Sequence, residues 1–155
     1  MPILHLGVID LPYADPPAAR RRRRRTKGGT PNKTTGDIAE ILEGRYHIME
    51  LFMQLHGEQV GNDFAESVSG AIESFIMGAP VSINPFGSAT SKLEDRFKQM
   101  LSTKELDSLG YPGIPTRAAQ LGHSKRFRHP YQRRAPRPSF IDTGQYQASF
   151  KAWVE

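Results

Sequence analysis

The chain has 155 residues with a net charge of +5 and contains no cysteine, which excludes disulfide bonds and thiolate metal sites. Its 12 prolines and 14 glycines predict one domain with a modest core and long stretches of loop or extended arm. No apolar run approaches the roughly 18–20 residues that a membrane-spanning helix needs, so we expect no membrane partner.

The charge is divided into three blocks along the chain. Residues 1–33 hold six more Lys and Arg than Asp and Glu, residues 34–113 hold seven fewer, and residues 114–155 again hold six more. A chain with an acidic middle between two basic ends suits head-to-tail contact with its own copies, or contact with a polyanion.

The predicted N-terminal arm covers residues 1–34. Residues 3–11 alternate roughly between apolar and polar and predict a short strand ending at Pro12, paired with another part of the fold or with a neighbouring chain. Residues 14–34 carry an arginine run between segments rich in proline and glycine, so we expect an extended chain that a partner orders. The run consists of Arg20, Arg21, Arg22, Arg23, Arg24 and Arg25.

The predicted helical core covers residues 35–110. Thr35 is predicted to be the N-cap of the first helix, because the acidic Asp37 follows in the first turn. An apolar stripe with spacings of three and four is interrupted at Gly57 and ends at Gly78, which predicts one long kinked helix or a hairpin of two. We interpret the stripe as core, with part of its bulk available to a neighbouring subunit: Ile38, Ile41, Leu42, Tyr46, Met49, Phe52 and Met53, then Val60, Phe64, Val68, Ala71, Ile72, Phe75 and Ile76.

Three further elements are predicted in this core. Residues 81–83 have some strand character. Residues 88–101 predict a third helix, and residues 102–109 a shorter one with Ser102 as its cap. The inward side chains of the third helix are expected to be Leu93, Phe97, Met100 and Leu101.

Residues 111–155 are predicted to contain a basic loop and a C-terminal segment that completes the core. Residues 116–122 predict a short capped helical turn, and after Thr143 we expect another helical turn and then a terminal strand. We expect the basic side chains of this part to contact partner proteins or DNA: Arg117, Lys125, Arg126, Arg128, Arg133, Arg134 and Arg137.

Each basic segment has two interpretations. The arginine run contacts phosphates or acidic proteins through paired guanidinium donors, or it is a solvated tail. The second segment contains the aromatic residues Phe127, Tyr131 and Phe140, which suit stacking on nucleic-acid bases. We favour a loop whose aromatic residues anchor on the domain while its arginines meet acidic partners.

Motifs of catalytic sites are missing from the sequence. A phosphate-binding loop needs a glycine directly before its lysine, but Asn32 precedes Lys33. No two of the five histidines have the four-residue spacing of a helical metal-binding pair. We therefore expect no enzyme activity, no cofactor, no metal and no small-molecule substrate.

The C-terminal run, residues 138–150, resembles a motif of tailed-bacteriophage tail-completion and neck proteins. In that motif an apolar pair after a proline precedes Thr-Gly, with an apolar or aromatic residue two positions after the glycine and a serine at the fifth. The matching residues are Thr143, Gly144, Tyr146, Ser149 and Phe150. Thr143 can cap a turn, and the four-residue spacing of Tyr146 and Phe150 places both on one helix face.

The resemblance implies an α+β fold, with two to three amphipathic helices packed on a small antiparallel sheet and long extended arms. It implies a ring of copies at the head–tail neck of the virion, with no catalytic residues. The implied partners are copies of the chain and other neck, portal or tail proteins, with packaged DNA within reach of the arginines. The implied location is the virion, which is assembled in the host cytoplasm.

Two alternatives remain open beside this hypothesis. One is a phage protein that binds nucleic acid without sequence specificity, which the arginine run would support through phosphate contacts. The other is a structural component of the tail or baseplate, which would share the same assembly chemistry.

Overall fold

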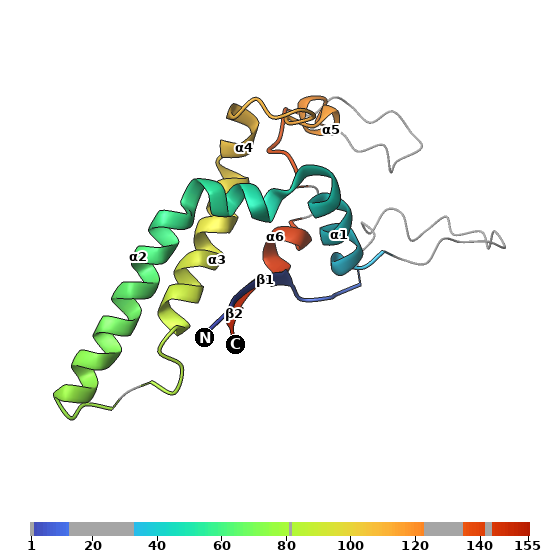
Figure 1. Ribbon diagram of the computed structural model, residues 1–155. Helices are drawn as coiled ribbons and strands as arrows, with labels where there is room; N and C mark the ends of the chain where they lie inside the picture. Colours follow the sequence, from blue (N-terminus) through green and yellow to red (C-terminus); the bar gives the residue numbers. More distant parts are fainter. Residues whose placement is uncertain (1, 13–32, 81, 123–134, 142–143) are drawn as a thin grey trace.

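The computed structural model describes residues 2–12, 33–80, 82–122, 135–141 and 144–155. This part of the chain is an α+β structure in which helices pack on a small antiparallel sheet, as expected (Figure 1). Its elements are β1 (Leu4–Val8), α1 (Thr35–Tyr46), α2 (Ile48–Ile76), α3 (Gly87–Ser102), α4 (Glu105–Ser108), α5 (Arg117–Gln120), α6 (Gln145–Ser149) and β2 (Phe150–Val154).

The two strands bring the ends of the chain together. β1 and β2 are antiparallel, with a register that runs from Leu4 opposite Val154 to Val8 opposite Phe150. The ladder continues beyond β1, where the backbone N–H of Ile9 donates to the carbonyl of Ser149 at 2.7 Å. The two strands expected at the ends of the chain are therefore confirmed, and the partner of the first strand is the chain's own C-terminal segment.

Thr34, and not Thr35, is the N-cap of α1. The Thr34 hydroxyl accepts from the backbone N–H of Asp37, and the Asp37 carboxylate accepts from the backbone N–H of Thr34. Thr35 is fully buried instead. Its hydroxyl donates to the carbonyl of Ile9 at 2.6 Å and accepts from the N–H of Leu11 at 2.8 Å, so it fastens the end of the β1 segment to the helix.

Of the two alternatives at Gly57, one long kinked helix and a hairpin, the helix continues, and the break between the first two helices lies at His47 instead. His47 has left-handed backbone angles, and the Glu43 carboxylate accepts from the N–H groups of Met49 and Glu50 at the start of α2. α2 then continues for 29 residues through Gly57 and bends within its length (Figure 1). A helical glycine costs only about 1 kcal/mol relative to alanine, which the packing of α2 on α3 offsets.

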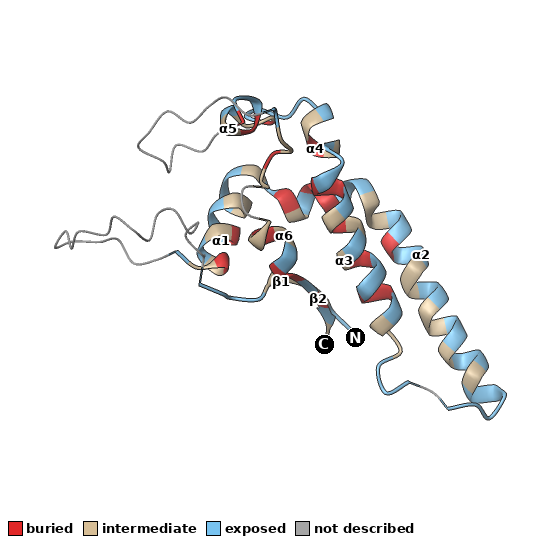
Figure 2. Cartoon of the chain, turned by 180° about the vertical axis from the view of Figure 1, so that it is seen from behind, coloured by how far each residue is buried: buried red, intermediate tan, exposed pale blue. Residues whose placement is uncertain are grey.

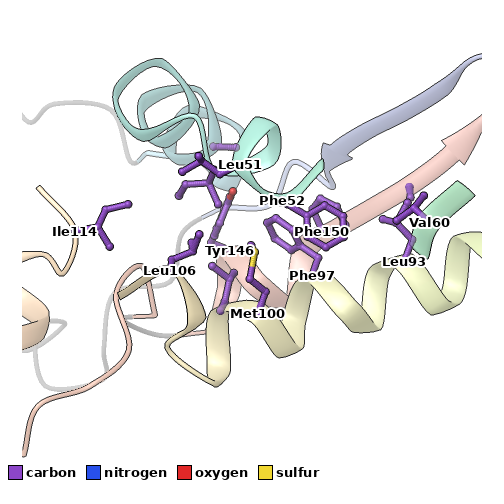
Figure 3. Packing of buried hydrophobic residues seen from close by; sticks show 14 residues of the cluster. Leu51, Phe52, Val60, Leu93, Phe97, Met100, Leu106, Ile114, Tyr146 and Phe150 are labelled. Carbon is purple, nitrogen blue, oxygen red and sulfur yellow. The ribbon is translucent and has the colours of Figure 1, made fainter. Parts of the chain in front are cut away.

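α3 lies antiparallel to the outer part of α2, and the core forms where this pair meets the sheet and α6 (Figures 1 and 2). The Phe97 ring stacks on Phe150 with centroids 3.8 Å apart, and it meets Phe52 and Tyr146 edge-on (Figure 3). The four inward residues predicted for the third helix, Phe97 among them, are all buried.

Smaller elements agree with the predictions in part. α3 matches the helix expected over residues 88–101, and α5 begins after Thr116, whose hydroxyl accepts from the N–H of Ala119. Ser102 does not cap the next helix, because it is the last residue of α3 and its hydroxyl donates to the carbonyl of Lys98. Of the predicted strand at residues 81–83, the two described residues are not in a strand.

Candidate assembly surfaces

The C-terminal motif lies inside the core. Gly144 adopts a φ of 78° at the start of α6, a conformation that favours glycine. Tyr146 and Phe150 are both buried against Phe97, but they do not share a helix face as expected, because α6 ends at Ser149 and Phe150 begins β2. Ser149 is also buried, and its hydroxyl donates to the carbonyl of Tyr146. Thr143 lies outside the described residues. The described part of the motif therefore shapes the fold and leaves little of its surface to a partner.

The Tyr146 hydroxyl is a neutral group in this environment. Burial raises its pKa well above the ordinary value, and the negative charge of Glu43 raises it further. No hydrogen bond to this oxygen is found among the described residues. Tyr146 thus acts here as a large apolar side chain.

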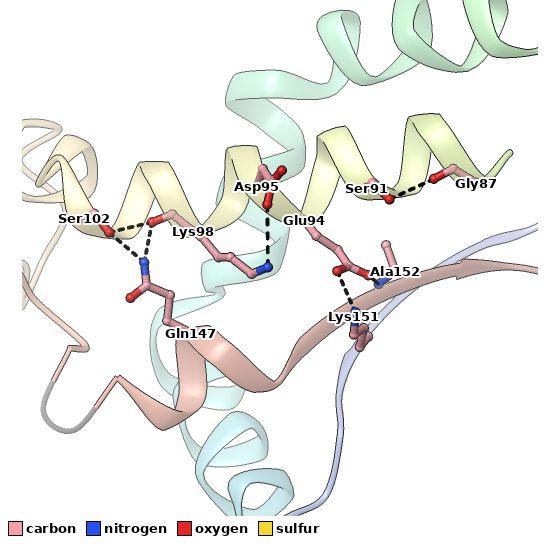
Figure 4. A network of polar contacts seen from close by, with 9 residues as sticks. All are labelled: Gly87, Ser91, Glu94, Asp95, Lys98, Ser102, Gln147, Lys151 and Ala152. Atoms are coloured by element: carbon pink, nitrogen blue, oxygen red, sulfur yellow. Dashed lines mark hydrogen bonds and ion pairs between the residues drawn. The ribbon is translucent and has the colours of Figure 1, made fainter.

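Side chains of α3 hold the C-terminal segment in place (Figure 4). One oxygen of Glu94 accepts from the backbone N–H of Ala152 at 3.2 Å, and the other pairs with Lys151 at 2.9 Å. Gln147 donates to the carbonyl of Lys98 and to the Ser102 hydroxyl, both at 2.6 Å. Glu94 therefore satisfies a donor on the outer edge of β2, which is also the edge that faces α3 (Figure 4).

Only two of the predicted contact cations lie within the described residues. Arg117 is exposed on α5. Arg137 is partly buried and holds its own loop, because its backbone N–H donates to the carbonyl of Ala119 and its guanidinium donates to the carbonyl of Ile141. The others lie outside the described residues: Arg20, Arg21, Arg22, Arg23, Arg24, Arg25, Lys125, Arg126, Arg128, Arg133 and Arg134.

One of the three aromatic residues of the basic segment is described. The Phe140 ring meets the Tyr46 ring edge-on, with centroids 5.0 Å apart. It is partly buried and packs against the core. This residue anchors on the domain, as we favoured for the segment as a whole. Phe127 and Tyr131 lie outside the described residues.

The surface of α2 is acidic. The helix contains five acids and neither Lys nor Arg. Asp63 pairs with Arg96 at 2.9 Å and with Lys92 at 3.5 Å, which links α2 to α3. The hydrogen bond that Lys92 donates to Glu66 raises the pKa of the lysine. The remaining three acids of α2 leave a net negative face on this arm of the molecule: Glu50, Glu58 and Glu73.

The far end of α2 exposes large apolar side chains that the sequence predicted to be core. Phe75, Ile76 and Met77 are 76%, 77% and 82% exposed, and Ile72 is also exposed. After the loop that follows α2, Ile83 is fully exposed. The prediction fails here because α2 has 29 residues and α3 only 16, so the last turns of α2 have no helix beside them (Figure 2).

An open hollow of about 880 Å³ lies beside this end of α2. Its lining is mainly small and polar, and it includes the hydroxyls of Ser67 and Ser88, which are 2.7 Å apart. Ser67 donates to the carbonyl of Pro85, which holds the loop against α2. No histidine or cysteine lines the hollow, and the Lys92 amine in its lining donates to Glu66.

The described residues contain no group of three or more His, Cys, Asp or Glu side chains arranged to hold a metal ion. In the same part of the chain, none of the helices combines the length and apolar character needed to cross a bilayer.

Two features of these surfaces were missed from the sequence. The exposed end of α2 had a signal, since residues 74–91 contain no charged side chain in a chain that is 24% charged. An uncharged stretch of this length around a helix end is typical of a contact surface. The bond between Glu94 and the N–H of Ala152 could not be predicted from neighbouring residues, because it depends on where β2 lies in the fold.

Comparison of the chain with protein-family models, with curated proteins and with solved structures found no match.

Proposed function

We propose that this chain is a structural virion protein that forms a ring at the head–tail neck of a tailed phage and catalyses no reaction. The observation that carries the proposal is the division of the molecule into two unlike ends. The acidic α2 arm ends in exposed apolar side chains, and α5, with the exposed Arg117, lies at the opposite end (Figure 1). Subunits with complementary ends are suited to repeated head-to-tail contact.

The C-terminal motif supports the choice of the neck. Residues 138–150 resemble the motif of tail-completion and neck proteins, and the described part of this segment builds the core against α3. In the proposed ring, α1 to α4 form the body. The arginine run and the basic residues 117–134 extend to acidic surfaces of neighbouring proteins or to the DNA that passes through the channel, whereas Arg137 holds its own loop.

The test is to delete the coding sequence from the genome that encodes the chain and to image the particles by electron microscopy. We expect filled heads and separate tails, and normal particles when the chain is supplied from a plasmid. Normal virions in the deletion strain would overturn the proposal. Joined particles with malformed tails would show instead that the chain belongs to the tail or baseplate.

A second candidate, nucleic-acid binding without sequence specificity, is favoured by the six consecutive arginines Arg20–Arg25. It predicts affinity for duplex DNA that falls steeply with salt, because each neutralised phosphate releases counterions. Replacing the six arginines by alanine separates the candidates. Lost DNA binding with normal head–tail joining supports this candidate, whereas retained DNA binding with failed joining supports the neck protein.

A further inference from the structure

The exposed end of the α2–α3 hairpin carries large apolar side chains that the described residues do not cover. We call its five large exposed residues the apolar tip: Ile72, Phe75, Ile76, Met77 and Ile83. Isolated exposed apolar side chains are normal on proteins, but a cluster of this size within twelve residues of one another marks a contact site. The described chain provides nothing that covers the tip, since α3 begins only at Gly87.

The charges around the apolar tip restrict what can bind there. Residues 46–91 contain no Lys or Arg, and Glu66 and Glu73 lie on the last turns of α2. An anionic lipid surface or a nucleic acid would be repelled by these carboxylates, and Lys92, the cation in the lining of the neighbouring hollow, is already paired with Glu66 and Asp63. The occupant that fits is a protein surface with apolar side chains and a basic border.

The other end of the same molecule has those properties. Leu109, Tyr111 and Leu121, which flank α5 in the sequence, are exposed, and Arg117 is exposed on α5 itself. Residues 108–141 carry seven cations and no acid. We call the exposed side chains of residues 109–121 the α5 surface. It lies at the end of the molecule away from the apolar tip (Figure 1).

The geometry points to a head-to-tail contact in which the apolar tip of one copy docks on the α5 surface of a second copy. This inference rests on the proposed ring, and it names the surfaces that join neighbouring subunits. The apolar residues of both surfaces would leave water, and the acids of α2 would face the cations of the neighbour. Because the two surfaces differ, each copy can contact two neighbours, which produces a ring when the rotation closes.

The first test compares assembly of the full-length chain by sedimentation velocity. The double variant Phe75→Ser, Ile76→Ser removes two of the most exposed side chains of the tip, and Ile3→Ser, at a residue 58% exposed near the sheet, is the matched control. We expect the tip variant to need at least about a tenfold higher concentration to assemble, since central apolar anchors dominate interfaces. The control should assemble like the unmodified chain, and circular dichroism should show the same helix content in all three.

The second test identifies which surfaces meet. Since the chain has no cysteine, single variants Met77→Cys and Tyr111→Cys can be mixed and joined with a short bismaleimide. We expect a linked species that contains one copy of each variant, in excess over linked pairs of the same variant. Ile3→Cys mixed with Tyr111→Cys should give no such excess.

The outcomes separate this inference from the proposed function. Assembly of the tip variant at unchanged concentration, or a strictly monomeric unmodified chain, overturns the docking inference. Flotation of the chain with phosphatidylglycerol vesicles that depends on Phe75 and Ile76 would overturn it in favour of a membrane. The proposed neck function is tested separately, by whether the deletion strain makes normal virions.

Discussion

The two ends of α2 have similar apolar side chains but differ in whether those side chains are buried. Near its start, Leu51 and Phe52 are buried against the core. Near its end, Phe75 and Ile76 are equally apolar and follow the same helical spacing, yet more than three quarters of each side chain is exposed. The comparison teaches that apolar spacing identifies one face of a helix and does not reveal what covers that face.

The cause of the difference is length. α3 is thirteen residues shorter than α2, which corresponds to about 20 Å of helix. The start of α2 packs on α3 through Phe52 and Phe97, whereas the described residues leave Phe75 and Ile76 of its last turn exposed. We interpret the covered half as the part that folds the molecule and the uncovered half as the part that joins it to another.

The largest expected effect is a difference in the free energy of unfolding between a substitution in the core that covers the start of α2 and one in the uncovered half of α2. Phe97→Ala should lower the free energy of unfolding by about 3 to 5 kcal/mol, because it empties the centre of the aromatic cluster around Phe52 and Phe150. Phe75→Ala should change it by less than about 0.5 kcal/mol. Urea denaturation of dilute, unassembled protein measures both, and similar losses for the two variants would contradict the division.

The next effect concerns the joint between β1 and α1. Thr35→Val removes a buried hydroxyl that bonds Ile9 and Leu11, and we expect a loss of about 1 to 3 kcal/mol from the two backbone groups left without it. Thr34→Ala removes the N-cap and should cost about 1 kcal/mol. Urea denaturation gives both values. A loss of less than about 0.5 kcal/mol for Thr35→Val would show that Thr35 does not fasten the strand.

A smaller effect is expected where α3 holds β2. Glu94→Ala leaves the edge N–H of Ala152 without its acceptor and should cost about 1 to 2 kcal/mol. The matched control is Asp95→Ala, whose carboxylate is exposed and pairs only with Lys98 at 3.7 Å among the described residues, with an expected change below about 0.5 kcal/mol. Hydrogen exchange at Ala152 should accelerate in the first variant and not in the second.

The smallest effect is that of salt on assembly. Screening weakens attraction between the acidic arm and basic segments, so assembly should shift to a concentration a few-fold higher between about 0.05 and 0.5 M salt. Stronger assembly in high salt would mean that apolar contact alone joins the subunits. Sedimentation velocity across the salt series makes this measurement.

The sequence predicted the positions of helices and strands better than it predicted how they pack on one another. The third helix, the turn capped by Thr116 and both terminal strands were found from local patterns, and each is where those patterns placed it. The N-cap was displaced by one residue, because Thr34 and Thr35 have the same capping chemistry and only the fold decides which hydroxyl is buried. The sequence could not decide between a kinked helix and a hairpin at Gly57, since tertiary packing overrides the weak helix preference of glycine.

The candidate surfaces were predictable only in part. The charge blocks and the arginine run are properties of the sequence, and they indicated a polarised molecule. The exposure of Phe75 depends on how far α3 extends, which no local pattern contains. The structural role of Arg137 was also hidden, because its partners Ala119 and Ile141 are brought to it by the fold.

Oxidation of Met77 by hydroxyl radicals tests most directly whether the end of α2 is a contact surface. Met77 is 82% exposed, while Met100, at 1%, serves as a buried reference in the same molecule. With rising protein concentration, we predict that oxidation of Met77 slows severalfold as copies associate, while that of Met100 stays low and that of Trp153, away from both surfaces, is unchanged. A Met77 oxidation rate that stays constant while the protein assembles would contradict the account.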